Sequence, residues 1–88
     1  MEELKQARRR AVGAKETLKH LTIGDALRVY IARDADEHVR GPVIQRARDV
    51  GVEVVEVESM QLLGRACGID VGAAAAALIG GGEQSADH

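Results

Sequence analysis

The sequence predicts an α/β fold in which helices cover both faces of a sheet, a three-layer α/β/α sandwich. Residues 27–32 alternate Leu, Val and Ile with other residues, and residues 52–57 are rich in valine, as expected of strands. A helical pattern lies between them. Strand, helix and strand at this spacing indicate a parallel strand pair with a right-handed crossover. Helical patterns before the first strand and after the second supply the remaining helices.

Two helices are expected ahead of the first strand. Residues 2–9 have a helical pattern, and residues 11–12 can form a short extended segment before Gly13. Gly13 then opens a second helix that runs to about Thr22, and Gly24 is placed to end it.

The helix between the two strands follows a polar stretch, residues 34–40. Pro42 has no N–H to donate and is acceptable in the first turn of a helix, so we expect this helix to begin close to it. Gly51 is placed to end the helix. The apolar residues that it is expected to present to the core are Val39, Val43, Ile44, Ala47 and Val50.

Ser59 can cap a fourth helix that Gly68 closes. Gly64, inside this helix, is expected to permit close packing against the sheet. Residues 73–79 are ambiguous, because their alanines favour a helix whereas the flanking glycines and the final Leu78-Ile79 allow a buried strand. The expected apolar stripe of the fourth helix consists of Leu62, Leu63, Ala66 and Cys67.

A single domain is expected over residues 1–79, and the Gly-rich polar residues 80–88 are expected to form a disordered tail. The longest apolar run, residues 71–79, is too short to cross a bilayer, and no apolar leader segment begins the chain. We therefore expect a cytoplasmic protein without membrane contact. The lone Cys67 cannot form an internal disulfide, which fits a reducing compartment.

The helix that begins at Gly13 has one strongly charged flank. Each residue of a helix advances by about 100°, so Lys15, Glu16 and Lys19 share one side, whereas Ala14, Leu18 and Leu21 share another. The result is a basic face with one acceptor at a helix N-terminus, whose free N–H groups also favour anions. Such a surface suits an RNA backbone and base edges, although an ordinary solvated face with an i,i+4 charge pattern has the same residues.

Charge is distributed unevenly along the chain, whose formal net charge is −2. Residues 1–48 contain eleven Lys and Arg against seven Asp and Glu, whereas residues 49–88 contain one against seven. A local basic face therefore matters more than the total for binding nucleic acid. Tyr30 is the only aromatic residue, which excludes the modules that stack bases on exposed rings.

No enzyme chemistry is expected of this chain. The three histidines and Cys67 lack the spacing of metal ligands, and no paired carboxylates, catalytic triad or phosphate-cradling loop is present in the sequence. We therefore predict no catalytic residue, metal ion, cofactor or small-molecule substrate. Cys67 is interpreted as a buried small hydrophobic residue.

Three groups of residues occur in an order and spacing that are specific together, although each is weak alone. They are Gly-Ala-Lys-Glu-Thr-Leu-Lys at 13–19, Val-Tyr-Ile-Ala-Arg-Asp-Ala-Asp at 29–36, and Val-Glu-Ser-Met at 57–60 followed by Leu-Gly-Arg-Ala-Cys-Gly-Ile-Asp-Val at 63–71. With the small residues that follow, they cover about residues 4–79. In this arrangement the chain resembles the L7Ae-type family of kink-turn RNA-binding ribosomal proteins, and its bacterial branch in particular.

The resemblance implies the L7Ae/L30e-like fold, in which residues 73–79 form a strand of a mixed four-stranded sheet. It also implies a partner and a function. The partner would be structured RNA with a kink-turn, a helix–bulge–helix motif with sheared G·A pairs, for example in ribosomal RNA or a riboswitch. The function would be to recognise and stabilise this bend as a monomer.

The resemblance further implies an RNA site made from two main segments. Lys15 would donate to guanine O6 or N7, Glu16 would accept from the guanine N1 and N2 edge, and Lys19 would meet a phosphate or the bulge. The loop 68–71 would pack its aliphatic surface on an extruded base. The residues of this site are Gly13, Ala14, Lys15, Glu16, Lys19, Arg33, Ile69, Asp70 and Val71.

Two of these residues depart from the family pattern. Archaeal and eukaryotic members usually have Asn at the position of Lys15, and Ala14 replaces a residue that is often Thr. Lysine gains charge and loses an acceptor, so we expect the balance between phosphate contacts and base discrimination to differ.

Other interpretations of the charged residues stay open. Arg33 could reach RNA or pair with Asp34 or Asp36, and residues 8–10, three arginines, could contact phosphates or serve only as solubilising charge. The acidic second half of the chain supports an alternative function, a protein-interaction module of the same fold without RNA binding. The acidic residues concerned are Asp49, Glu53, Glu56 and Glu58.

Overall fold

The computed structural model describes residues 1–80, which form four helices and four strands in alternation. The predicted disordered tail, 80–88, lies outside the described residues apart from Gly80. The elements in chain order are α1 (Glu2–Gln6), β1 (Arg10–Val12), α2 (Ala14–Ile23), β2 (Ala26–Ala32), α3 (Glu37–Val50), β3 (Glu53–Val57), α4 (Met60–Ala66) and β4 (Ala75–Ile79).

The strands form one mixed sheet in the order β1-β4-β2-β3. β2 and β3 are parallel, as the strand–helix–strand spacing predicts, and β4 is antiparallel to both β1 and β2. The ambiguous segment is therefore a strand, and the expectation of a mixed four-stranded sheet is confirmed. In the registers, Val12 lies opposite Ala76 and Ile31 lies opposite Ala75, so the ends of β1 and β2 meet the start of β4.

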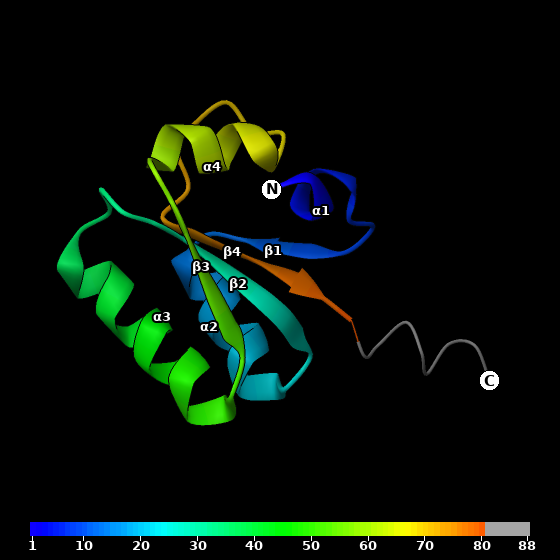
Figure 1. The fold of residues 1–88 in the computed structure, drawn as a ribbon, viewed down its shortest axis with the longest axis vertical. Helices are drawn as coiled ribbons and strands as arrows, with labels where there is room; N and C mark the ends of the chain where they lie inside the picture. The colour runs from blue at the N-terminus through cyan, green and yellow to red at the C-terminus, as the bar shows by residue number, and fades with distance from the viewer. Residues whose placement is uncertain (81–88) are drawn as a thin grey trace.

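Helices cover both faces of the sheet, so the predicted three-layer sandwich is confirmed (Figure 1). α2 and α3 pack on one face, and α1 and α4 pack on the other. The central strand β4 contributes to both cores, because successive side chains of a strand point to opposite faces. Ala75 and Ala77 belong to the cluster under α2 and α3, whereas Ala76 belongs to the cluster under α4. Their small side chains, all fully buried, let the helices approach the centre of the sheet closely.

Two helix boundaries differ from the sequence prediction. The first helix ends at Gln6 rather than at residue 9, because Ala7 already has an extended backbone with ψ 136°. The helix α3 begins at Glu37, so Pro42 lies in its interior and not in its first turn. Asp36 is responsible for the early start, since its carboxylate accepts a hydrogen bond from the His38 N–H at 2.8 Å and caps the helix.

Five of the nine residues of α3 and α4 that were predicted to face the core are buried, Val39 and Ile44 are half-buried, and two are exposed. Val50 and Leu62 are exposed, because Val50 is the last residue of its helix and the short helix α4 presents only a narrow face to the sheet. The buried face of α2 includes Thr17, which is fully enclosed although polar. Cys67 is buried as expected, and burial raises the pKa of its thiol.

An ion-pair network fastens the short helix α1 to the sheet. The Glu3 carboxylate accepts from the Arg28 Nη1 at 2.8 Å and from the Tyr30 hydroxyl at 3.3 Å. Arg28 also donates from Nε to Glu53 at 3.2 Å. The hydrogen bond from Arg28 lowers the pKa of Glu3 below its ordinary value, because it favours the ionised carboxylate.

We predict that Glu3→Gln lowers the stability of the fold at neutral pH and has less effect in acid. The folded-state pKa of Glu3 lies below its unfolded value. The contribution of this carboxylate is therefore complete above the unfolded pKa and is lost as the pH falls through the folded one. Urea denaturation midpoints of wild type and variant across the acidic range measure the effect. A difference that stays constant with pH, or that persists in an Arg28→Gln background, would contradict it.

Candidate nucleic-acid interface

The backbone at the start of α2 requires a glycine. Gly13 has φ 101°, a left-handed conformation that residues with a side chain rarely adopt. Its N–H donates to the Ala75 carbonyl oxygen at 2.7 Å. Gly13 thus turns the chain from β1 into α2 while holding the first turn of the helix against the start of β4.

The first turns of α2 present their charged residues outward. Lys15, Glu16 and Lys19 are all exposed, as predicted, whereas Thr17 and Leu21 are buried on the opposite side. Ala14 and Leu18, which were expected on the apolar flank, are only half-buried. None of the three exposed residues forms an ion pair within the described part of the chain, so their charged groups are available to a ligand.

The loop between α4 and β4 has one exposed and one inward-facing aliphatic residue. Val71 is 70% exposed, and Asp70 is exposed beside it. Ile69 is half-buried and packs against the core under α4, which corrects the expectation that it is exposed. The aliphatic surface that the loop offers to a partner is therefore mainly that of Val71.

Gly64 fixes the path of this loop. A Cβ atom at Gly64 would overlap the carbonyl oxygen of Val71, and the Ile69 N–H donates to the Gly64 carbonyl oxygen at 3.0 Å. Gly64 therefore permits close approach of the loop to α4, and not of α4 to the sheet as the sequence suggested. The Ala73 N–H donates to the Met60 carbonyl oxygen at 3.0 Å and holds the loop's other end.

Three segments that are distant in sequence meet at one edge of the sheet (Figure 1). The Gly13–Ala75 hydrogen bond brings the start of α2 to the start of β4. The Ala32 N–H donates to the Ala74 carbonyl oxygen at 2.9 Å, which brings the end of β2 to the same place. The charged face of α2, the loop 68–74 and the residue after β2 therefore share this edge.

Two side-chain acceptors position α4 above this edge. The Ser59 hydroxyl oxygen accepts from the Leu62 N–H at 3.1 Å, as the sequence predicts for a capping residue. The Asp34 carboxylate accepts from the Met60 N–H at 2.8 Å and so ties the turn after β2 to the first turn of the helix. Sequence reasoning missed this role of Asp34, because the two partners are far apart in the chain.

Arg33 lies at the shared edge but is engaged by a carboxylate. Its Nε donates to Glu56 at 3.2 Å, and not to Asp34 or Asp36 as the sequence suggested. Glu56 also accepts from Arg40 at 3.2 Å. The Arg33 side chain is nevertheless 64% exposed, so it can exchange this partner for a phosphate without moving its backbone.

A cavity next to the loop contains two polar residues that the sequence analysis did not single out. Gln61 and Arg65 are exposed and one turn apart on α4, so they lie on the same side of that helix. Their i,i+4 spacing on the polar face was the available signal. The residues that line the cavity are Gln61, Arg65, Ile69, Asp70, Val71 and Gly72.

The acidic half of the chain is partly neutralised in the folded molecule. Glu53 pairs with Arg28, and Glu56 pairs with both Arg33 and Arg40. Asp49 accepts a hydrogen bond from the amide of Gln45 at 3.0 Å. The ion pairs of Glu53 and Glu56 leave less free negative charge for a basic protein partner than the sequence suggested, whereas the neutral Gln45 amide leaves the charge of Asp49 unchanged.

Other kinds of site find little support in residues 1–80. This part of the chain contains no cluster of three or more His, Cys, Asp or Glu side chains that could hold a metal ion. Among the same residues, no helix has the length and apolar character needed to cross a membrane.

Comparisons with known proteins find a family and relatives for this chain. The model of the ribosomal protein L7Ae/L30e/S12e/Gadd45 family matches residues 1–87. The RNA-binding protein TTE2299 of Caldanaerobacter subterraneus subsp. tengcongensis is 48% identical over 69 residues, which are 78% of this chain and 84% of that protein. The large ribosomal subunit protein eL8 of Halobacterium salinarum is 39% identical over 72 residues, which are 81% of this chain and 60% of that protein. Among solved structures, the 15.5kD RNA binding protein of Giardia lamblia has a TM-score of 0.81 at 29% identity, covering 97% of this chain and 72% of that one.

We predict that Gly64→Ala displaces the loop 68–74 and destabilises the fold. The added methyl group overlaps the Val71 carbonyl, and overpacking of this kind costs about 1–3 kcal/mol. Urea denaturation measures the loss, and amide chemical shifts of residues 69–72 report the displacement. Gly41→Ala in α3, where a new Cβ meets nothing within 4 Å, is the matched control. Equal effects of the two substitutions would contradict the packing role of Gly64.

Proposed function

Because this chain belongs to the ribosomal protein L7Ae/L30e/S12e/Gadd45 family, we propose that it binds RNA and that its target is a kink-turn. In this proposal the protein recognises the helix–bulge–helix motif with sheared G·A pairs and stabilises its bent form. The relatives named as RNA-binding proteins support RNA as the partner. The resemblance of residues 13–19, 29–36 and 57–71 to kink-turn-binding proteins supports the choice of motif.

One observation carries the proposal, the meeting of the charged face of α2 and the loop 68–74 at a single sheet edge. A hydrogen bond of 2.7 Å from the Gly13 N–H to the Ala75 carbonyl oxygen joins the residue before α2 to the residue after this loop. A sharply bent duplex offers base edges and an extruded base close to each other, whereas a straight duplex does not. A surface with a charged part and an aliphatic part side by side fits the bent form.

The start of α2 would read base edges in the widened major groove of the kink. Lys15 has donors suited to guanine O6 and N7, and the Glu16 carboxylate can accept from guanine N1 and N2. Lys19 lies one turn further along the exposed face and would contact a phosphate. Lysine at residue 15 supplies charge and donors only, so discrimination between bases rests more heavily on Glu16.

The loop would hold the extruded base by aliphatic contact. Val71 is the exposed apolar residue there, and no aromatic ring is available because Tyr30 is buried in the core. Gln61 and Arg65 line the adjacent cavity and have donors for a base edge or a phosphate. Arg33, at the same edge, would exchange Glu56 for the RNA backbone.

Binding of this kind acts by selection of a conformation. A flexible helix–bulge–helix RNA samples bent and extended forms, and a protein that makes contacts only with the bent form shifts the population toward it. The protein needs no catalytic group for this function.

We predict that Glu16→Ala reduces discrimination between a kink-turn RNA and the same RNA without its G·A pairs. A good contact of a side chain with a base edge contributes about 1–3 kcal/mol of discrimination. The dissociation constants of both RNAs, measured by gel shift or fluorescence anisotropy, should therefore converge by about 5- to 150-fold. Equal affinity of wild type for the two RNAs would exclude kink-turn recognition.

We predict that Lys19→Ala weakens binding of both RNAs to a similar extent. A lost phosphate contact carries no sequence information, and it should lower the slope of log affinity against log salt by about 0.9 for a duplex phosphate or about 0.7 for one in the bulge. Titrations at several salt concentrations measure this slope. An unchanged slope with selective loss of one RNA would show that Lys19 reads a base instead.

A further inference from the structure

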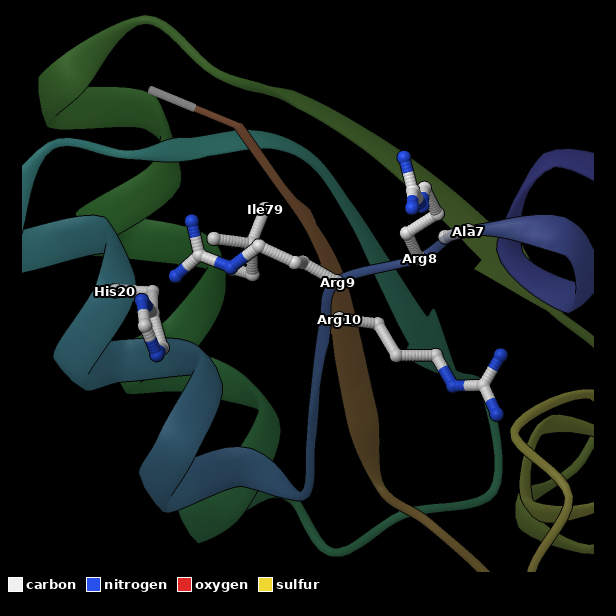
Figure 2. Close-up of a pocket in the computed structure, with 6 residues that line it drawn as sticks. All are labelled: Ala7, Arg8, Arg9, Arg10, His20 and Ile79. Atoms are coloured by element: carbon white, nitrogen blue, oxygen red, sulfur yellow. The ribbon is translucent and has the colours of Figure 1, made fainter. Parts of the chain in front are cut away.

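The three consecutive arginines at the start of the sheet have different surroundings. Arg10 lies on the α4 side, where its guanidinium donates to the carbonyl oxygens of Leu4 at 3.0 Å, Lys5 at 3.3 Å and Cys67 at 2.8 Å. It therefore links α1, β1 and the end of α4. Figure 2 shows its side chain pointing away from His20. Arg10 is a structural residue, and no carboxylate of residues 1–80 neutralises its charge.

Arg9, at a bend directly before β1, points the other way (Figure 2). In Figure 2 its guanidinium extends toward α2, on the side of His20 and Ile79. The guanidinium forms one hydrogen bond within the described residues, a long one from Nη1 to the Gly80 carbonyl oxygen at 3.4 Å. The residue is exposed, so most of its donors face solvent.

A cavity of about 350 Å³ lies between this arginine and α2. No acidic side chain lines it. The strand side contributes the charge and the helix side contributes a histidine. The residues that line it are Ala7, Arg8, Arg9, Arg10, His20 and Ile79 (Figure 2).

The histidine of this cavity is itself paired with a carboxylate. Asp25 contacts the His20 ring, with Nδ1 and Oδ1 2.8 Å apart, and its side chain is only 17% exposed. The contact orients the imidazole and leaves Nε2 as its second polar atom. Asp25 therefore holds the His20 ring that lines the cavity and does not pair with Arg9.

Arg9 lacks the carboxylate partner that three other arginines have. Arg28, Arg33 and Arg40 each have a carboxylate oxygen within 3.2 Å. Arg9 has no such partner among residues 1–80, and no carboxylate lines the cavity that it faces. Guanidinium groups bind phosphate strongly, because two parallel N–H groups match two oxygens.

We propose that the cavity between Arg9 and His20 binds a backbone phosphate of the RNA, as a second contact outside the kink. This inference rests on the proposed function. His20 is five residues beyond Lys15, a rise of about 7.5 Å along α2, and Lys19 lies exposed next to it in the chain. A stem that leaves the kink along α2 would thus pass from Lys15 and Lys19 to this cavity.

The experiment compares two RNAs that contain the same kink-turn, one with minimal stems and one with both stems lengthened by a helical turn. Wild type should bind the long RNA more tightly. Arg9→Gln should weaken binding of the long RNA several-fold, with a salt slope lower by about 0.9, and leave the short RNA unchanged. Arg9→Lys should restore part of the affinity. Arg46→Gln, an exposed arginine of α3 outside this cavity, is the control with the same change in charge.

The outcomes separate this inference from the proposed function. If Arg9→Gln and Arg46→Gln behave alike on the long RNA while discrimination for G·A pairs persists, the inference is wrong and the proposed function stands. If wild type binds RNAs with and without the G·A pairs equally well, the proposed function is wrong, and the inference that rests on it is wrong as well. Inorganic phosphate alone, added to labelled protein, tests a free anion as the ligand. Saturation of the Arg9 side-chain resonance by phosphate, without any effect of stem length, would also overturn the inference.

Discussion

The hydrogen bond between the Gly13 N–H and the Ala75 carbonyl oxygen, 2.7 Å long, is the contact on which the arrangement of the candidate interface depends. It exists because β4 enters the sheet between β1 and β2 and is antiparallel to both. The start of β4 must then lie beside the ends of its two neighbours. The chain enters α2 directly after β1 and enters β4 directly after the loop 68–74. The topology therefore places a charged helix start and an aliphatic loop together.

The alanines of β4 make this arrangement possible. Ala75, Ala76 and Ala77 are completely buried between helices on both faces of the sheet, and their small side chains let both helical layers approach β4 closely. Hydrogen bonds then fix the details at the edge, with Asp34 and Ser59 holding the first turn of α4. Glu53 and Glu56 form ion pairs with arginines, which neutralise much of the negative charge near β3. Lys15 and Lys19 on α2 form no ion pair within residues 1–80, so their positive charge stays free.

Local patterns were enough to predict most of the fold. The period of apolar residues, the capping residues and the glycines that end helices gave the order of elements, and the crossover rule gave the parallel pair. Residues 73–79 could not be decided in this way, because the helix propensity of alanine competes with burial in the sheet. The start of α3 was misplaced because proline, which has no N–H to donate, favours the first turn of a helix, whereas the cap of Asp36 sets the boundary and leaves Pro42 inside the helix.

The candidate site was predicted in part. The exposure of Lys15, Glu16 and Lys19 follows from helical geometry and is confirmed. The partner of Arg33, the half-burial of Ile69 and the contact of Gly64 with the loop depend on segments that are distant in sequence, so no local pattern could reveal them. The same is true of the different environments of Arg9 and Arg10. Kink-turn specificity, a monomeric state and a cytoplasmic location stay predictions.

The most direct test of the central claim is a titration of the isotope-labelled protein with kink-turn RNA, followed by backbone amide resonances. We expect residues 14–19 and residues 69–72 to shift together, with the same dependence on RNA concentration, because one ligand touches both. Shifts confined to one of the two segments, or shifts of both with different saturation, would show that they do not form one binding surface.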